Sequence, residues 1–126
     1  MSPNHILSDC RVLIVEDEPM IAMTLEDMLA DLGCHIAGTA SQIEAALDMI
    51  TLGGIDAALL DVNLGAEKID RVADELERRH IPFIFTTGYG QAGIPALHKK
   101  HIVVQKPFRV DELGRALTQE ISKPKA

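Results

Sequence analysis

The sequence has few aromatic residues and few cysteines. Tryptophan is absent and aromatic residues make up 3% of the 126 residues, whereas hydrophobic residues make up 47%. We therefore expect an aliphatic core, which is typical of a parallel sheet rich in Val, Ile and Leu. The two cysteines, Cys10 and Cys34, show no metal-binding or redox spacing, and we expect both to be reduced.

Long apolar runs and an excess of positive charge are also missing. No stretch reaches the roughly 18 apolar residues of a membrane span, and no basic segment followed by an apolar one opens the chain. The net charge of -7 opposes binding to nucleic acid and to anionic membranes. We therefore expect a cytoplasmic protein with no direct nucleic-acid or membrane contact.

Two hydrophobic periods alternate along the chain. Short apolar runs, typical of buried strands, cover 11–16, 34–40, 56–61, 81–87 and 102–105. Amphipathic segments predict five helices. The first has Pro19 in its first turn, the second opens with a capping box at 41–44, and the others cover about 67–79, 94–100 and 110–121. Five alternations of strand and helix predict a doubly wound α/β fold. This is a flavodoxin-like (βα)5 architecture, with a five-stranded parallel sheet and helices on both faces.

The length of the chain is that of a single domain, residues 1–126, with its core at about 11–121. Residues 1–9 and 122–126 carry no hydrophobic period and are expected to be loose ends. The histidines show no ligand spacing, and we expect them on the surface or in loops: His5, His35, His80, His98 and His101.

Polar side chains follow the ends of four predicted strands. Glu16 and Asp17 follow the first strand, Asp61 ends the third, Thr87 ends the fourth and Lys106 follows the fifth. Because parallel strands finish at one edge of a sheet, these side chains are expected to meet there. Clustered carboxylates raise one another's pKa unless a cation intervenes, and Mg²⁺ (or Mn²⁺) prefers oxygen ligands. The pattern predicts an open metal site where Asp61 acts as a nucleophile toward phosphorus, assisted by Lys106 and Thr87.

In order and spacing, these residues resemble the receiver domain of two-component response regulators, over about 11–121. The resemblance implies that Asp61 is the phosphoacceptor. It also implies that Asp17 binds the metal directly, that Glu16 acts mainly through water, and that Asn63 offers its backbone carbonyl to the metal.

The same resemblance extends to the fourth and fifth strands. It implies that Thr87 and Lys106 contact the phosphoryl group and that the peptide bond between Lys106 and Pro107 is cis. One position departs from the family pattern. Well-studied receivers carry a Tyr or Phe three residues before the Lys, and this sequence has Val103 there, so the usual aromatic switch is absent.

The segment from Phe85 to Gly90 resembles the Phe-Ala-Thr-Gly-aromatic-Gly signature of the atypical FATGUY receivers of alphaproteobacterial regulators, with Thr86 in place of Ala. We therefore hypothesise that the loop of Gly88, Tyr89 and Gly90, with the short helix after it, responds to phosphorylation in place of an aromatic on the fifth strand.

The resemblance implies a phosphoacceptor response regulator and not a turnover enzyme. A sensor histidine kinase or a histidine phosphotransfer protein would donate the phosphoryl group to Asp61. The chain would then signal to a downstream protein by conformational change or act as a phosphate sink, because no covalent output domain is expected. The sequence leaves open whether phosphorylation leads the chain to form a homodimer.

Two other classes share part of the pattern. A phosphatase of the haloacid dehalogenase type also uses an Asp nucleophile with magnesium, but it needs an acid two residues later, where this sequence has Asn63. A flavodoxin-like cofactor carrier needs a glycine-rich phosphate cradle after the first strand. Here that place holds Glu16, Asp17 and Glu18, which would repel phosphate unless metal is bound.

Overall fold

The structure is a computed structural model that describes residues 5–64, 69–87 and 101–123. Five parallel strands form one sheet in the order β2-β1-β3-β4-β5. Their bounds are β1 Arg11–Val15, β2 His35–Ala40, β3 Ala57–Asp61, β4 Phe83–Thr87 and β5 Val103–Gln105. The predicted parallel sheet is confirmed.

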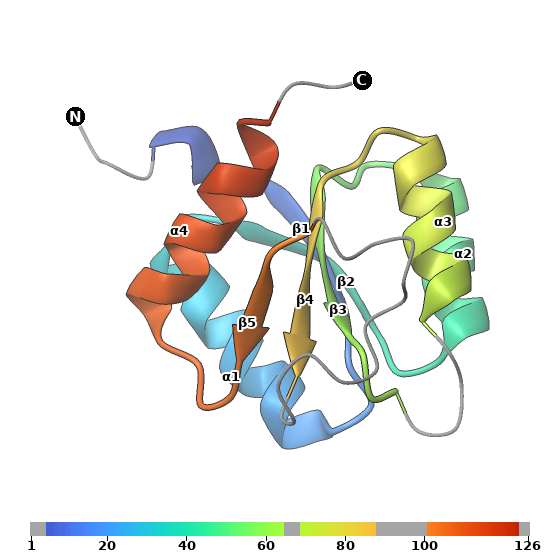
Figure 1. Ribbon diagram of the computed structural model, residues 1–126, viewed down its shortest axis with the longest axis horizontal. Coiled ribbons are helices and arrows are strands. Elements are labelled where there is room, and N and C mark those ends of the chain that lie inside the picture. Colours follow the sequence, from blue (N-terminus) through green and yellow to red (C-terminus); the bar gives the residue numbers. More distant parts are fainter. Residues whose placement is uncertain (1–4, 65–68, 88–100, 124–126) are drawn as a thin grey trace.

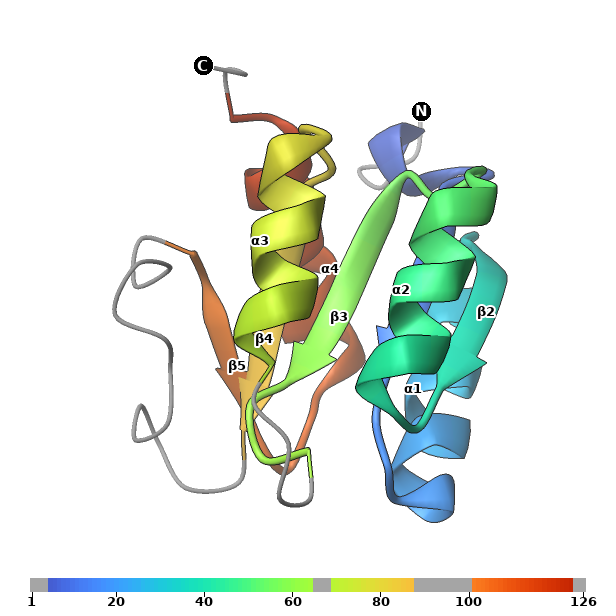
Figure 2. The same ribbon diagram turned by 90° about the vertical axis from the view of Figure 1, so that its right-hand side faces the viewer.

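Helices cover both faces of this sheet, as predicted for a doubly wound fold. The described helices are the 3-10 turn η1 His5–Leu7, and α1 Pro19–Asp31, α2 Ile43–Leu52, α3 Asp70–Arg78 and α4 Val110–Ile121. Helices α2 and α3 lie on one face, and α1 and α4 lie on the other (Figures 1 and 2). The helix predicted at 94–100 lies outside the described residues.

The sheet divides the core into two clusters. The first cluster lies under α2 and α3 and includes Leu60 and Phe85, while the second lies under α1 and α4 and includes Leu59 and Ile84. Neighbouring residues of one strand thus enter opposite clusters, because successive side chains of a strand point to opposite faces. All five residues of β3 are buried, which explains its unbroken apolar sequence before Asp61.

Local signals for helix ends were partly right. Pro19 occupies the first turn of α1, and Gly33 follows its C-cap residue with the positive φ of 89° that glycine adopts readily. The predicted capping box is wrong, because α2 has Gln42 as its N-cap residue and no side-chain cap hydrogen bond. Glu44, the acid of that box, instead bonds Arg71 of α3 at 2.7 Å.

Two other expectations are only partly right. Residues 1–9 are not a loose end throughout, because Leu7 in η1 is fully buried in the second cluster. His101 lies in a loop before β5, as expected, but it is not on the surface: only 10% of its side chain is exposed, and its ring stacks on Phe83 with centroids 4.0 Å apart. Its ring nitrogens contact Glu77 and Glu120, and these two contacts offset the cost of burying the imidazole.

Strand ends differ by one or two residues from the sequence prediction. The strand predicted to begin at 81 begins at Phe83, because Pro82 has no N–H to donate to the ladder. The Pro82 carbonyl still accepts the Ala58 N–H at 3.1 Å.

In the described part of the chain, none of the helices combines the length and apolar character of a bilayer span.

Candidate functional site

The site lies where the winding of the sheet reverses. After β1 the chain moves outward to β2 at one edge, and it then returns to β3 on the opposite side of β1 before continuing to β4 and β5. Ligands of open α/β sheets bind beyond the carboxyl ends of the strands at such a reversal. Glu16 and Asp17 follow β1 there, and Asp61 is the last residue of β3.

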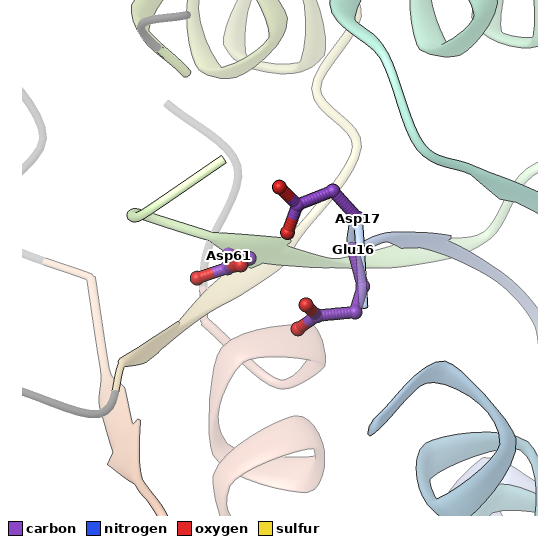
Figure 3. Close-up of side chains that lie close together, drawn as sticks. All are labelled: Glu16, Asp17 and Asp61. Carbon is purple, nitrogen blue, oxygen red and sulfur yellow. The ribbon is translucent and has the colours of Figure 1, made fainter. Parts of the chain in front are cut away.

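Three carboxylates meet at this point. One carboxylate oxygen from each of Glu16, Asp17 and Asp61 lies within 4.8 Å of the other two. Figure 3 shows the three side chains side by side at the ends of β1 and β3. Glu16 and Asp61 are each 2% exposed, and Asp17 is the most exposed of the three. The sequence predicted that these distant acidic residues lie together at one edge of the sheet, and the structure places them there.

The environment of Glu16 disfavours the charged form of its carboxylate. Its Oε2 accepts the Glu18 N–H at 3.1 Å, whereas its Oε1 is buried without a hydrogen-bond partner among the described residues. Burial raises the pKa of Glu16 to about 7; the Asp61 charge also raises it, while the Glu18 N–H and the Lys106 charge lower it. A buried carboxylate oxygen without a partner is the kind of group that a cation would satisfy.

Hydrogen bonds fix the orientation of Asp61. Its Oδ1 accepts the backbone N–H of Asn63 at 2.9 Å, and the Val62 N–H next to it donates to the Thr86 carbonyl at 3.1 Å. The side-chain amide of Asn63 donates to the Thr87 hydroxyl at 3.3 Å. Asn63 therefore links Asp61 to Thr87. The sequence analysis predicted a role only for the backbone carbonyl of Asn63. The side-chain amide, two residues beyond Asp61, could also have been predicted to form a hydrogen bond at the site.

The fourth and fifth strands bring the remaining candidates to the same edge. Thr87 is fully buried, and its carbonyl accepts the Lys106 N–H at 2.9 Å. The peptide bond between Lys106 and Pro107 is cis. Val103 is half-buried on β5 and packs against the first cluster. The predicted switch residues lie outside the described residues: Gly88, Tyr89 and Gly90.

The donor set fits a hard divalent cation such as Mg²⁺ or Mn²⁺. These ions take carboxylate and carbonyl oxygens and commonly use one or two protein carboxylates, with water or phosphate in the other positions. Glu16 and Asp17 after β1 and Asp61 at the end of β3 would each offer one carboxylate oxygen as a ligand. The positions that such an ion leaves to water or phosphate are those that a phosphoryl group on Asp61 would use.

Comparisons with known proteins agree with this architecture. The family model described as "Response regulator receiver domain" matches residues 12–118. Among curated proteins, the phyllosphere-induced regulator PhyR of Methylorubrum extorquens is 30% identical over 119 residues, which cover 87% of this chain and 43% of PhyR. The chain thus spans less than half the length of that relative.

Solved structures give the same result. The solution structure of SdrG from Sphingomonas melonis Fr1 is 46% identical with a TM-score of 0.79, over 86% of this chain and 93% of SdrG. SdrG is also solved in a BeF3-activated conformation, with a TM-score of 0.75, over 88% of this chain and 95% of that one. The receiver (REC) domain of PhyR from Erythrobacter litoralis is 32% identical with a TM-score of 0.78, over 96% of this chain and 98% of that one.

The sheet order, the acidic cluster at the reversal point and the family match over 12–118 lead to one assignment. Members of the matched family are signalling proteins and not typical turnover enzymes. The chain belongs to the response regulator receiver domain family.

Proposed function

We propose that Asp61 is the phosphoacceptor of this response regulator and that it takes a phosphoryl group from a phosphohistidine. The donor would be a sensor histidine kinase or a histidine phosphotransfer protein. The observation that supports this proposal is the convergence of Asp61 with Glu16 and Asp17, whose carboxylate oxygens lie within 4.8 Å of one another. The charge of Lys106 lowers the pKa of Glu16, which indicates that a cationic side chain lies near the acidic cluster.

The contacts of Asp61 suggest how the transfer would proceed. Its Oδ1 accepts the Asn63 N–H, so Oδ2 is the oxygen that would attack phosphorus. A P–O bond to Asp61 forms as the P–N bond of the phosphohistidine breaks, and the leaving imidazole keeps the electron pair. The Lys106 ammonium and the Thr87 hydroxyl would then stabilise charge on the phosphoryl oxygens.

A divalent cation would be held by Glu16, Asp17, Asp61 and the backbone carbonyl of Asn63. When bound, it would neutralise the charge between the carboxylates and the incoming phosphoryl group. Glu16, whose Oε1 is buried without a described partner, would gain the most from its presence.

In signalling, a phosphoryl group on Asp61 would compete with the Asn63 amide for the Thr87 hydroxyl. The amide donates to that hydroxyl at 3.3 Å, which is long for a hydrogen bond. A phosphoryl group on Asp61 brings about -1.5 to -2 charges and three strong acceptors, which would draw Thr87 and Lys106 toward it. This movement at the ends of β4 and β5 would favour a second conformation of the domain. A phosphate sink would use the same transfer without a downstream partner.

The phosphoacceptor assignment is tested with a small-molecule donor. We expect acetyl phosphate and Mg²⁺ to add one phosphoryl group, measured by intact mass, as an adduct that is stable in acid and lost in base. Asp61→Asn should abolish the adduct completely, because an amide cannot replace the attacking carboxylate. Asp56→Asn is the matched control, since Asp56 lies beside the opposite end of the same strand and its carboxylate accepts the Arg11 N–H at 3.0 Å. An adduct that persists in Asp61→Asn, or multiple turnover of phosphate esters, would contradict the assignment.

The metal proposal predicts a change in thermal stability. At a hundredfold excess over its Kd, Mg²⁺ should stabilise the wild-type chain by about 2.7 kcal/mol relative to EDTA, measured by thermal unfolding. Binding should strengthen as the pH rises through about 7, because burial raises the pKa of Glu16 to about 7 and the cation competes with that proton. Asp17→Asn should lose most of the effect. Asp27→Asn, an exposed change on α1, should retain it.

A further inference from the structure

The two cysteines lie level with each other on neighbouring strands. Cys10 immediately precedes β1 and Cys34 immediately precedes β2. The next residues along the two strands, Arg11 and His35, are register partners, and the His35 N–H donates to the Cys10 carbonyl at 2.8 Å. Adjacent strands are about 4.8 Å apart, which falls within the Cα separation of roughly 4.4–6.8 Å that disulfides span.

Both thiols also point to the same side of the sheet. Cys10 and Cys34 belong to the second cluster, under α1 and α4, and each is 7% exposed. Both are free. A hydrogen bond between the two thiols raises the pKa of Cys10, with burial adding to the rise, and it lowers the pKa of Cys34. Cys34 is therefore the better nucleophile of the pair.

We propose that Cys10 and Cys34 form a dithiol that peroxide oxidises to an intramolecular disulfide at the end of the sheet opposite Asp61. The Cys34 thiolate attacks one peroxide oxygen, the O–O bond breaks, and the departing hydroxide takes a proton to become water. The resulting sulfenic acid is attacked by the Cys10 sulfur, the S–O bond breaks, and a second water leaves with the Cys10 proton. One peroxide and two thiols thus give one disulfide and two waters.

The position of this bond separates it from the phosphoacceptor. Cys10 and Cys34 lie at the amino ends of β1 and β2, whereas Glu16 and Asp61 lie at the carboxyl ends of β1 and β3. The bond would close a loop that contains β1 and α1 and would constrain the unfolded chain. We therefore expect oxidation to stabilise the domain without changing the rate at which acetyl phosphate modifies Asp61. This inference does not rest on the proposed phosphorylation.

The test uses the full chain and hydrogen peroxide. After oxidation, removal of peroxide and alkylation in denaturant, we expect a monomer that has lost two hydrogens and takes up no N-ethylmaleimide until dithiothreitol is added. The midpoint of thermal unfolding should rise by roughly 10 °C and return on reduction. Methionine oxidation adds oxygen and is therefore distinguished by mass. Two thiols that still react fully, or a disulfide that joins two chains, would overturn the proposal.

Labelling of the two thiols tests which one reacts first. In the wild-type chain, where each thiol has the other as its neighbour, a limiting amount of N-ethylmaleimide should label Cys34 at least several-fold faster than Cys10, mapped by peptide mass. In Cys10→Ala the Cys34 sulfenic acid has no intramolecular partner, so dimedone should trap it. Equal labelling of the two thiols in the wild-type chain would contradict the order of the steps. The wild-type mass measurement tests the disulfide itself even if a variant folds poorly.

Discussion

The rate at which acetyl phosphate modifies Asp61 is expected to fall about 100-fold in Lys106→Met, measured by the initial rate of adduct formation at fixed Mg²⁺. The Lys106 charge lowers the pKa of Glu16, so its ammonium acts on the acidic cluster directly. Without it, the phosphoryl oxygens approach three carboxylates with one fewer positive charge to stabilise them. The loss should appear in the transfer step, where negative charge is most concentrated.

A matched control separates this local effect from a general loss of charge. Arg115→Met removes the same charge from an exposed position on α4, 4.0 Å from Asp111, and should leave the rate unchanged. The affinity for Mg²⁺ should be measured in both variants, because removing a cation beside the cluster is expected to strengthen metal binding. A wild-type rate in Lys106→Met would show that Lys106 has no part in the transfer.

Glu120→Ala is expected to lower the free energy of unfolding by about 3–5 kcal/mol, measured by urea denaturation. Glu120 is 4% exposed, and its carboxylate accepts hydrogen bonds from the Ile102 N–H at 3.0 Å and the Lys123 ammonium at 2.8 Å. It also contacts His101 Nδ1 at 3.2 Å, and the other ring nitrogen lies 2.8 Å from Glu77. Removing the carboxylate therefore takes away the acceptor of the part-buried Ile102 N–H and one of the two carboxylate contacts of His101. Glu112→Ala, an exposed change on the same helix, should cost much less.

The same network predicts how this loss depends on pH. Burial alone would lower the pKa of His101, but the hydrogen bonds to Glu120 and Glu77 outweigh it and raise the pKa above 6.5. The pKa of Glu120 is lowered below 4.5, since hydrogen bonds from His101, Lys123 and Ile102 outweigh its burial. Stability from His101 is complete below pH 6.5 and is lost as the pH rises through its folded-state pKa. Stability from Glu120 is present above pH 4.5 and is lost as the pH falls through its own lowered pKa.

The cost of Glu120→Ala should therefore be larger near pH 5.5 than near pH 8.5, because the stability that the His101 proton contributes is lost as the pH rises through its raised pKa. His101→Phe should flatten the pH dependence while keeping the stacking on Phe83, whose ring lies 4.0 Å from that of His101. An equal cost at both pH values would show that the imidazole does not gain a proton from this environment.

The parts of the fold and site that the sequence predicted are those set by strand ends. Asp61 closes a run of four apolar residues that is buried on both faces, and such a strand delivers its last side chain to a fixed place. Glu16 and Asp17 follow another buried strand, β1. Because β1 and β3 pair in parallel, their ends lie together, and so the two residues were predicted to lie near Asp61. Only two features were needed, an apolar period and a polar residue at its end, and both are local in the sequence.

The features that the sequence did not predict depend on partners from distant elements. His101 follows two lysines in a polar stretch, and its burial depends on Glu77 of α3 and Glu120 of α4. Leu7 lies in a short segment without a period, and its burial depends on the second cluster. The capping-box pattern was local, but the pairing of Glu44 with Arg71 is tertiary.

The division of the core has a consequence for how such a chain can diverge. Leu60 and Ile50 belong to the first cluster and Leu59 and Leu117 to the second, with the sheet backbone between them. Residues without shared neighbours contribute nearly additively to stability. Substitutions beneath α2 and α3 can therefore accumulate without compensating changes beneath α1 and α4, and each face can acquire its own outer surface over evolutionary time.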